Sequence, residues 1–370
     1  MVIKNDCTYD ENRFTGKVWR AYTEDGTEMS HAHLRIRESR FHREYINILT
    51  FGGIGTSPEY RRQHCVRTMF EQELPKGREY GAALALLHPF SFSYYRKFGF
   101  ERIYDTVQAI MPIKALDFVE RYPDLVPYTE EKQEELLRLF DAFSKNRNIM
   151  FRRYDDKLFL RNDQKLYLHY DNAHTLTGYI AYEPKNHYDG INRMVSDELY
   201  VKEIGFLNRE TLLHLLGFLR MYEGELEMVR FHDITPTPEL DMLLKHNMDT
   251  KYDVHPDIMG RVLDTEAALK LVKYPDRKGT FTLHVDDWLE NVRGNYRVEY
   301  ENGTCEVTKL DEDAECEVCL SETAFVRFLY GTDAYTPETA IYMDGVSLNG
   351  KAEDFFRAFP KRINGLYEHF

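Results

Sequence analysis

At 370 residues the chain is long enough for two or three domains, each with a hydrophobic core of its own. Its composition, with 43% hydrophobic and 30% charged residues, is that of an ordinary globular protein. The formal net charge of −14 argues against a general nucleic-acid-binding protein and favours the attraction of a cationic substrate.

Cysteine content and hydropathy exclude two further classes of protein. Five cysteines, an odd number in so long a chain, argue against a disulfide framework. The longest apolar run, Ala82 to Leu87, is far too short to span a membrane, and the N-terminus lacks the basic and apolar pattern of a signal peptide. We therefore expect a cytoplasmic protein with no membrane partner.

The first part of the chain begins without a clear secondary-structure pattern and then has two expected strands. Residues 1–15 are polar and carry no clear signal, whereas Val18–Tyr22 and His31–Ile36 have the composition of strands joined by a turn. Side chains alternate along a strand, so His31 and His33 share a face. With no third ligand nearby, these histidines fit exposed strand residues better than a metal site.

The next stretch carries the strongest local pattern. A β-prone run, Tyr45–Phe51, leads into a turn at Pro58, and Arg61-Arg62 opens a segment with helical spacing. Three glycines interrupt the end of the strand: Gly52, Gly53 and Gly55. Glycines there predict a bulge, or a backbone left open to a ligand.

A turn that precedes a helix is a suitable place for a phosphate. The first N–H groups of a helix are unpaired, and they lie at the positive end of its dipole. Arg61 and Arg62 would add fixed charge and paired donors. On spacing alone the stretch fits equally well an ordinary glycine-weakened strand followed by a basic surface helix.

The elements that follow predict an α/β sheet. Gly81–Leu87 suits a buried parallel strand, residues 91–100 form a short aromatic helix closed by Gly99, and Glu101–Met111 returns as a strand. In such sheets the ligand lies at the carboxyl ends of the strands.

The middle third repeats the same order of elements. The expected helices and strands are Glu130–Phe143, Lys165–Tyr170, Thr175–Tyr182, Leu199–Leu207, a helix capped by Asn208, and Leu226–Phe231. No Pro-x-x-Arg-Arg and no glycine turn precede the helix after Asn208, so nothing there would cradle a phosphate. An unrelated α/β domain remains an alternative on this pattern alone.

The last third predicts an α+β meander with helices at its edges. Strands are expected at Gly279–Val285 and Asn295–Tyr300, and a helix at about Glu322–Leu329. Cys316 and Cys319 form a CxxC, but no second pair stands at metal spacing. Inside a strand the two thiols would face opposite sides, so we expect no metal site.

Two stretches resemble the motifs of the GNAT N-acetyltransferases. Residues 58–67, Pro-Glu-Tyr-Arg-Arg followed by an arginine at 67, are similar to the acetyl-CoA motif of that family. The segment Tyr95-Arg96-Lys97-Phe98-Gly99-Phe100 resembles its second landmark, a tyrosine-containing segment a few residues after the fifth strand. The two occur in the order and spacing that the family has.

Taken over its whole length, the chain looks like the Eis family of acetyltransferases. The resemblance rests on the start of the last third, Met259-x-Arg261-Val262-x-Asp264, on the strand Phe281–Asp287, and on the aromatic terminal residue. It implies a GNAT acetyl-CoA-binding domain (1–113), a degenerate GNAT-like domain without cofactor (114–257) and a sterol carrier protein-like domain (258–370). The fold class is then α/β and α+β, in tandem, and the assembly a homo-oligomer, typically a hexamer.

The resemblance also implies roles for individual residues. Acetyl-CoA, the cosubstrate, would be held by Ile54, Thr56, Arg61, Arg62, His64 and Val66. The catalytic residues would be Tyr95, as general acid, and Phe370, whose terminal carboxylate would act as base. No metal is implied.

The sequence departs from the family pattern at two places. His64 stands where the acetyl-CoA motif has a glycine, and its side chain would crowd the pyrophosphate unless the imidazole points away. A GNAT domain usually opens with a strand and two helices that wall the acceptor site, whereas here some 15 residues precede the first clear strand.

The function expected from all this is transfer of an acetyl group from acetyl-CoA to a primary amine. The acceptor would be a cationic, aminoglycoside-like small molecule or a lysine, and transfer would be direct, in a ternary complex. The alternative is a catalytically lapsed scaffold, or a protein that binds a lipid-like ligand through its C-terminal domain.

Overall fold

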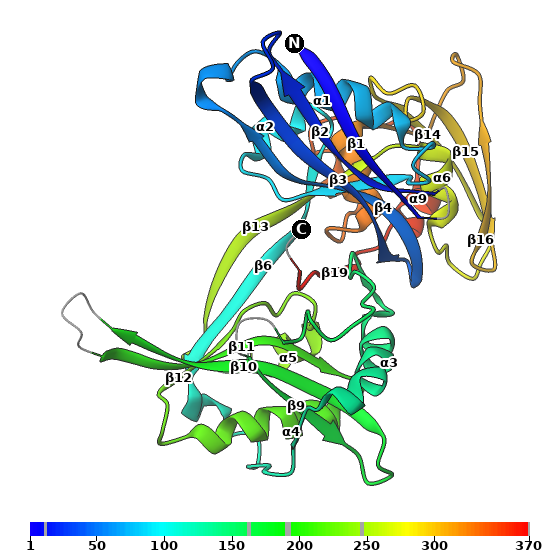
Figure 1. Ribbon diagram of the computed structural model, residues 1–370. Helices are drawn as coiled ribbons and strands as arrows, with labels where there is room; N and C mark the ends of the chain where they lie inside the picture. Colours follow the sequence, from blue (N-terminus) through cyan, green and yellow to red (C-terminus); the bar gives the residue numbers. More distant parts are fainter. Residues whose placement is uncertain (11–12, 161–163, 189–193, 245–247, 369–370) are drawn as a thin grey trace. The chain divides into compact units, whose positions relative to one another are not determined.

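The structure, a computed structural model, describes residues 1–10, 13–160, 164–188, 194–244 and 248–368 (Figure 1). These residues divide into two compact units. Unit 1 comprises Met1–Tyr104 and Asp257–Asn364, and unit 2 comprises Asp105–Pro256 and Gly365–Glu368. Each unit is therefore assembled from stretches that lie far apart in the sequence.

The first part of unit 1 is a mixed sheet. Its strands are β1 (Val2–Asp10), β2 (Arg13–Tyr22), β3 (Glu28–Phe41), β4 (Glu44–Thr56) and β5 (Leu84–Leu87), with the end of β13 (Lys251–Val262) beside β5. Strands β1 to β4 pair in antiparallel fashion, β4 and β5 run parallel, and helix α1 (Cys65–Glu73) connects them. Helix α2 (Phe92–Arg96) follows β5.

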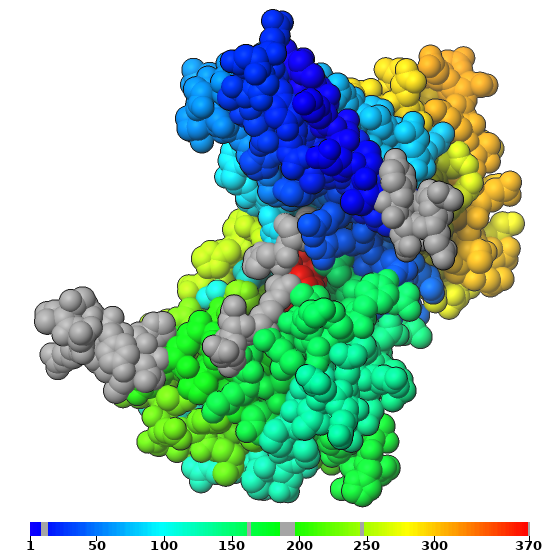
Figure 2. Space-filling view, viewed as in Figure 1, coloured from blue at the N-terminus to red at the C-terminus, as the bar shows by residue number. Residues whose placement is uncertain are grey.

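The start of the chain differs from the expectation. Residues 2–10 form a strand, and β2 begins at Arg13 rather than at Val18. Only two residues separate β1 from β2, so the pair of helices expected between the first strands of a GNAT domain is missing there. The side chains of β1 that the structure describes are mostly exposed, and its dark blue atoms form part of the visible surface of unit 1 (Figure 2).

The second part of unit 1 has a five-stranded sheet in the order β16-β15-β14-β17-β18. Its strands are β14 (Gly279–Asp286), β15 (Gly294–Glu301), β16 (Thr304–Lys309), β17 (Val318–Ser321) and β18 (Val346–Leu348). The accompanying helices are α6 (Thr265–Leu271), α7 (Glu322–Tyr330), α8 (Pro337–Ala340) and α9 (Glu353–Ala358), and a short strand β19 (Ile363–Asn364) follows. This agrees with the expected meander with helices.

A buried ion pair ties the two parts of unit 1 together. Arg261, at the end of β13, binds Asp287 through both guanidinium NH groups, at 2.5 and 2.6 Å, and both side chains are fully buried. The Arg261 guanidinium also lies against Gly99 of the aromatic motif. Three residues after Arg261, Asp264 caps α6 by accepting a hydrogen bond from the Ala267 N–H.

Unit 2 repeats the strand and helix order of the first sheet. Its strands are β7 (Val126–Pro127), β8 (Arg147–Asn148), β9 (Lys165–Tyr170), β10 (Leu176–Tyr188), β11 (Met194–Phe206) and β12 (Met228–Phe231), joined by the end of β6 (Glu101–Pro112). Helices α3 (Gln133–Ser144), α4 (Arg209–Leu219) and α5 (Pro238–Leu244) complete the unit. As α1 connects the parallel strands β4 and β5, so α4 connects the parallel strands β11 and β12.

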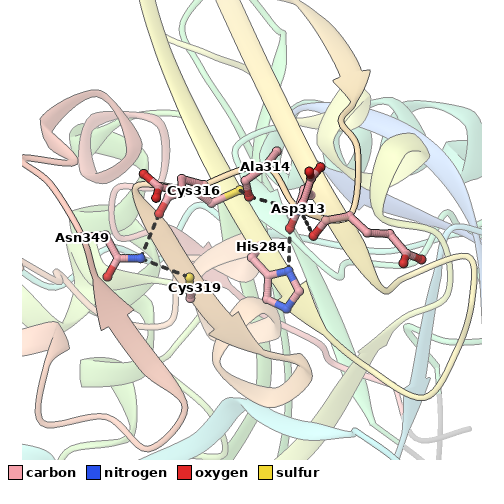
Figure 3. A pocket seen from close by; sticks show the side chains of 9 residues that line it. His284, Asp313, Ala314, Cys316, Cys319 and Asn349 are labelled. Atoms are coloured by element: carbon pink, nitrogen blue, oxygen red, sulfur yellow. Dashed lines mark hydrogen bonds between the residues drawn. The ribbon is translucent and has the colours of Figure 1, made fainter.

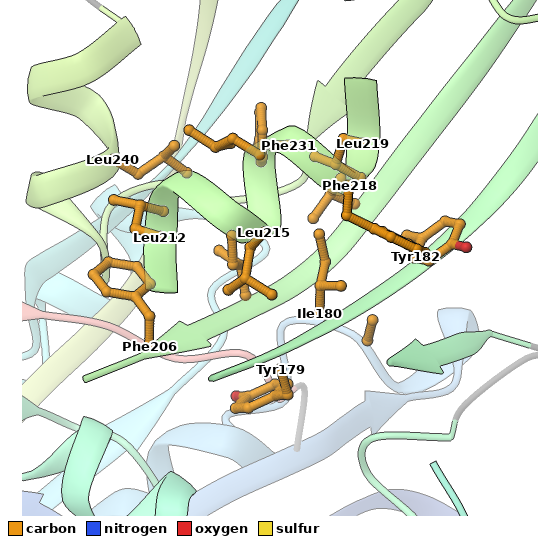
Figure 4. Close-up of a cluster of buried hydrophobic side chains, with 14 of the residues drawn as sticks. Tyr179, Ile180, Tyr182, Phe206, Leu212, Leu215, Phe218, Leu219, Phe231 and Leu240 are labelled. Carbon is orange, nitrogen blue, oxygen red and sulfur yellow. The ribbon is translucent and has the colours of Figure 1, made fainter. Parts of the chain in front are cut away.

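The core of unit 2 lies between its sheet and its helices (Figure 4). Asn208 caps α4 as predicted, with its side chain accepting a hydrogen bond from the Thr211 N–H. Four leucines of this helix are buried: Leu212, Leu215, Leu216 and Leu219. The mixed α/β fold is therefore confirmed, whereas the division at residues 113 and 257 stays a prediction.

We expect Gly99→Ala to destabilise unit 1 more than Gly81→Ala. Both glycines have positive φ, +79° and +66°, so alanine at either costs about 1–2 kcal/mol. A Cβ at Gly99 would lie 2.6 Å from Cζ of Arg261, whereas one at Gly81 meets nothing within 4 Å. That contact adds roughly 1–3 kcal/mol. Urea unfolding followed by circular dichroism measures both variants, and equal losses would contradict the close packing at Gly99.

Candidate active site

Strand β4 carries a bulge at Gly53. On the neighbouring β3, His31 pairs with Gly55 and His33 pairs with Gly52, so β4 has one residue more than β3 over this interval. Gly53 has a φ of +54°, a conformation that glycine adopts without strain. The bulge that the glycines predicted is therefore confirmed, and it turns the backbone of β4 away from regular pairing.

Strand β4 also parts from its parallel neighbour at the same place. Pairing between β4 and β5 runs from Ile48 and Leu84 to Phe51 and Leu87, where β5 ends. Strand β4 continues to Thr56, and no described strand pairs with this last portion on the side away from β3. The residues of this portion are half-buried or exposed. Their backbone N–H and C=O groups on that side have no strand partner among the described residues, so this edge is suited to receive a ligand with amide and carbonyl groups.

The turn after β4 has an unusual backbone. A short 3-10 turn, Pro58–Tyr60, is followed by Arg62 and His64, whose φ values are +66° and +64°. Helix α1 then begins at Cys65, later than the Arg61-Arg62 start that its spacing predicted. No side chain caps α1 and its first turn holds no acidic residue, so the N–H groups of that turn are available for an anion.

The structure places the six predicted acetyl-CoA-binding residues along this one stretch. Ile54 and Thr56 lie on β4 and are half-buried. Arg61, Arg62 and His64 lie in the turn and are exposed. Val66 lies in the first turn of α1 and is half-buried. The exposed His64 imidazole makes no capping hydrogen bond to α1.

Two histidines of β3 occupy the space that the glycines of β4 leave free. A Cβ on Gly53 would lie 2.9 Å from Cδ2 of His33, and one on Gly55 would lie 2.8 Å from Nε2 of His31. His31 Nδ1 is 2.9 Å from a carboxylate oxygen of Glu28. Burial and nearby positive charge lower the pKa of His33, so its imidazole is neutral at neutral pH.

Tyr95 packs in the aromatic cluster beside this stretch. It lies on α2, which is capped by Ser91, and its side chain is only 2% exposed. Its ring meets Phe70 of α1 edge to face, with 6.1 Å between centroids. Burial, with a smaller effect of Tyr94, raises the pKa of Tyr95, so the phenol holds its proton at neutral pH.

Sequence reasoning missed a second titratable pair close to β5. His88 follows directly after β5, and its Nδ1 lies 3.0 Å from a carboxylate oxygen of Asp257. In the sequence, His88 is simply the residue after the expected strand Gly81–Leu87. The pairing with Asp257 joins positions 169 residues apart, so no local pattern could have indicated it.

Phe370 lies outside the described residues, whereas the segment just before it is well anchored within unit 2. The Glu368 carboxylate binds the buried Arg153 at 2.6 Å. The Tyr367 hydroxyl donates a hydrogen bond to the carbonyl of Ile204 at 3.1 Å. Residues up to 368 are therefore docked rather than frayed.

A separate cavity of about 420 Å³ lies in the C-terminal part of unit 1 (Figure 3). Cys316 and Cys319 both line it, because Cys316 lies before β17 rather than within the strand. The expectation that the two thiols face opposite sides is therefore wrong. His284 Nδ1 is 2.6 Å from Asn295, and the Asn349 amide donates to the Cys316 carbonyl.

Two features are absent from the residues that the structure describes. No group of three histidine, cysteine or acidic side chains is arranged there to hold a metal ion. In the same residues, no helix is both long and apolar enough to cross a lipid bilayer.

Residues 9–103 match the family described as Acetyltransferase (GNAT) domain. The chain thus carries a GNAT-type acetyltransferase domain, and it is an enzyme of the N-acetyltransferase kind. A GNAT domain implies the use of acetyl-CoA. No curated protein matches the sequence.

Solved structures share the fold at low sequence identity. A GCN5-related N-acetyltransferase from Anabaena variabilis has a TM-score of 0.82 and 17% identity, covering 96% of this chain and 90% of that one. A probable N-acyltransferase from Enterococcus faecalis has a TM-score of 0.79 and 17% identity, with 96% and 89% covered. Eis1 from Mycobacterium abscessus has a TM-score of 0.72 and 15% identity, with 95% and 91% covered.

We expect His64→Gly to be more stable than His64→Ala. Both changes remove the exposed imidazole, but only glycine adopts a φ of +64° without strain. The expected difference in the free energy of unfolding is about 1–2 kcal/mol. Chemical denaturation of the two variants measures it. Equal stabilities would mean that residue 64 does not hold the left-handed conformation in solution.

Proposed function

We propose that the chain is an Eis-like N-acetyltransferase that moves an acetyl group from acetyl-CoA directly to a primary amine. The observation that carries this proposal is the bulged end of β4, which parts from β5 and leads into the uncapped start of α1. It lies within the residues that match the GNAT domain. The acceptor would be a cationic, aminoglycoside-like molecule or a lysine, in keeping with a net charge of −14.

Acetyl-CoA would lie along the free edge of β4 with its pyrophosphate at the turn. Backbone groups of Ile54 and Thr56 would bind the pantetheine arm, because amides there have no strand partner on one side among the described residues. Arg61 and Arg62 would supply charge-assisted hydrogen bonds. Backbone N–H groups at His64 and Val66 would bind the phosphate oxygens, with the dipole of α1 adding to the attraction.

The chemistry needs one base and one acid. The protonated amine must lose a proton before its lone pair can attack the thioester carbonyl carbon. The C–N bond then forms, the C–S bond breaks, and the CoA thiolate takes a proton. We assign that last proton to Tyr95. A phenol is protonated at neutral pH, and burial raises the pKa of Tyr95 further.

The terminal carboxylate of Phe370 is the proposed base. The assignment rests on the resemblance to the Eis family and on the docking of Tyr367 and Glu368 within unit 2. A carboxylate is a weak base in water, with an ordinary pKa of about 3.5, so its position matters more than its basicity.

The resemblance to the Eis family also underlies our proposal for the domain organisation and assembly of the protein. We propose domains at 1–113, 114–257 and 258–370, the last of them sterol carrier protein-like, and a cytoplasmic homo-oligomer, by resemblance a hexamer. Neither nucleic acid nor membrane is a proposed partner. The separate five-stranded sheet of the last third supports a third domain, and the likeness of fold to Eis1 of Mycobacterium abscessus supports the overall order.

His64 favours a second candidate, a scaffold that has lost catalysis or a binder of a lipid-like ligand. A side chain stands there in place of the motif's glycine. Titration calorimetry with acetyl-CoA separates the two proposals. Binding by the native protein supports the enzyme, whereas binding that appears only in His64→Gly supports the scaffold.

We expect Arg62→Gln to weaken acetyl-CoA binding by roughly tenfold or more, because a charge-assisted hydrogen bond to phosphate contributes about 1.5–3 kcal/mol. Arg61→Gln should act in the same direction. Arg138→Gln is the control, since that exposed arginine lies on α3 of unit 2. Calorimetry at two salt concentrations measures all three, and an unchanged dissociation constant for both turn variants would remove the turn from the binding site.

We expect Tyr95→Phe and deletion of Phe370 each to lower kcat by about 10²–10⁴, the usual contribution of a proton-transferring group. The dissociation constant for acetyl-CoA should hardly change. Release of CoA thiol with kanamycin, or with an Nα-blocked lysine, measures turnover. Tyr94→Phe on the same helix is the control. Full activity of Tyr95→Phe would leave that residue as packing, and full activity without Phe370 would remove its carboxylate from the mechanism.

A further inference from the structure

A polar row of side chains crosses the five-stranded sheet of unit 1. His284 on β14 pairs in register with Asn295 on β15 and with Cys319 on β17. Residues paired in this way lie on the same face of a sheet, on strands about 4.8 Å apart. The opposite face of β14 carries the buried residues Phe281 and Leu283. All three residues of the row line the cavity of about 420 Å³, where Figure 3 shows His284 and Cys319 beside one another.

Asn295 fixes the tautomer of His284. The Nδ2 atom of Asn295 lies 2.8, 3.1 and 3.2 Å from three carbonyl oxygens, those of Asp311, Glu312 and Ala314. Carbonyl oxygens only accept hydrogen bonds, so the amide oxygen of Asn295 faces His284, 2.6 Å from Nδ1. That oxygen cannot donate either, so Nδ1 carries the N–H. In the neutral imidazole the lone pair is therefore on Nε2, at the end of the ring away from Asn295.

Cys319 is the thiol placed to use this base. A cysteine attacks as its thiolate, whereas an ordinary thiol is mostly protonated at neutral pH. The Nε2 lone pair of His284 can take the proton, and Nδ2 of Asn349, 3.5 Å from the Cys319 sulfur, can stabilise the charge left behind. Burial raises the pKa of the second cavity thiol, Cys316, so Cys316 offers less thiolate than an ordinary cysteine. A nucleophile, a base and a group that orients the base are the parts of a nucleophilic site.

The charges around the cavity select the kind of reagent that can enter. The carboxylates of Glu312, Asp313 and Glu315 line the cavity and are exposed. None of the described residues that line it is a lysine or an arginine. A cavity with charges of one sign concentrates counter-ions and repels ions of its own sign. A small cationic molecule is therefore favoured over an anionic one, and salt should weaken the preference.

We propose that Cys319, His284 and Asn295 form a thiol-modification site, at which the Cys319 sulfur attacks a small cationic disulfide. The thiol proton moves to Nε2 of His284, and a new S–S bond forms as the S–S bond of the reagent breaks. The departing thiolate takes the proton from His284. The products are a mixed disulfide on Cys319 and one free amino thiol. The inference uses none of the residues assigned to acetyl transfer, so it does not depend on the proposed function.

The test compares two cysteines within one protein. Cystamine is the cationic disulfide, and dithiodiglycolate is its anionic counterpart. The full chain with Cys316→Ser is used, because an adduct on Cys319 cannot then pass to the second cavity thiol. Cys7, an exposed thiol on β1, is the internal reference. Peptide mass spectrometry after timed reaction gives the rate of modification at each cysteine.

We expect cystamine to modify Cys319 about tenfold faster than Cys7 or more. A positioned base contributes roughly 100-fold or more in enzymes, and the half-buried position of Cys319 offsets part of that gain. His284→Phe and His284→Gln should each remove the advantage and leave the rate at Cys7 unchanged. The ratio of the two rates should be higher with cystamine than with dithiodiglycolate, and Glu312→Gln with Glu315→Gln should reduce that difference.

Three results would overturn the inference. A rate at Cys319 no higher than that at Cys7 would mean that the thiol is not activated. An undiminished rate at Cys319 in either folded His284 variant would remove the base from the site. Equal rate ratios with the two disulfides would refute the selection of cationic reagents. Circular dichroism shows which variants fold, and the comparison of Cys319 with Cys7 decides the matter even if neither His284 variant does.

Discussion

The buried pair of Arg261 and Asp287 is the constraint on which unit 1 depends. It joins the strand that completes the first sheet to the C-terminal part of the same unit, and both partners are fully buried. Breaking such a pair costs about 3–5 kcal/mol, because a charge is left buried without a partner. The same guanidinium lies against Gly99, so the aromatic motif that carries Tyr95 is shaped partly by residues from the last third of the chain. The candidate site in the first hundred residues is thus supported by a side chain more than 150 positions away in the sequence.

The candidate site lies where the regular strand pairing of the first sheet is interrupted. A regular pair of parallel strands would use up the backbone groups of β4, whereas the bulge at Gly53 and the end of β5 leave one edge of β4 open. The open edge, the turn with two left-handed residues and the start of α1 follow one another within 14 residues, 52–65. If acetyl-CoA lies along this edge as proposed, donors fixed in this way need no rearrangement when charge develops during acyl transfer.

Local chemistry in the sequence predicted this part of the structure well. Glycines at 52, 53 and 55 indicated a bulge and Gly99 indicated a helix end, since a glycine acts through its own backbone. Asn208 indicated a helix start, since its side chain caps a backbone N–H only three residues further on. Features that depend on partners far apart in the sequence could not be predicted from it. The pairing of His88 with Asp257 and the anchoring of Glu368 on Arg153 join residues 169 and 215 positions apart. The strand at Val2–Asp10 was missed because its polar, exposed residues show no alternation of apolar side chains.

The nested path of the chain has a consequence for its synthesis. The polypeptide leaves unit 1 after Tyr104, returns to it at Asp257, and gives its last described residues back to unit 2. A ribosome that has made the first hundred residues has therefore made a sheet without its β13 neighbour and without either member of the buried pair Arg261 and Asp287. Unit 2 in turn lacks Glu368 until that residue is synthesised. Arg153, which also binds Glu203, therefore lacks one of its two carboxylate partners until then. Neither unit can finish folding while the chain is still short, and nascent chains of this protein should need protection for most of their elongation.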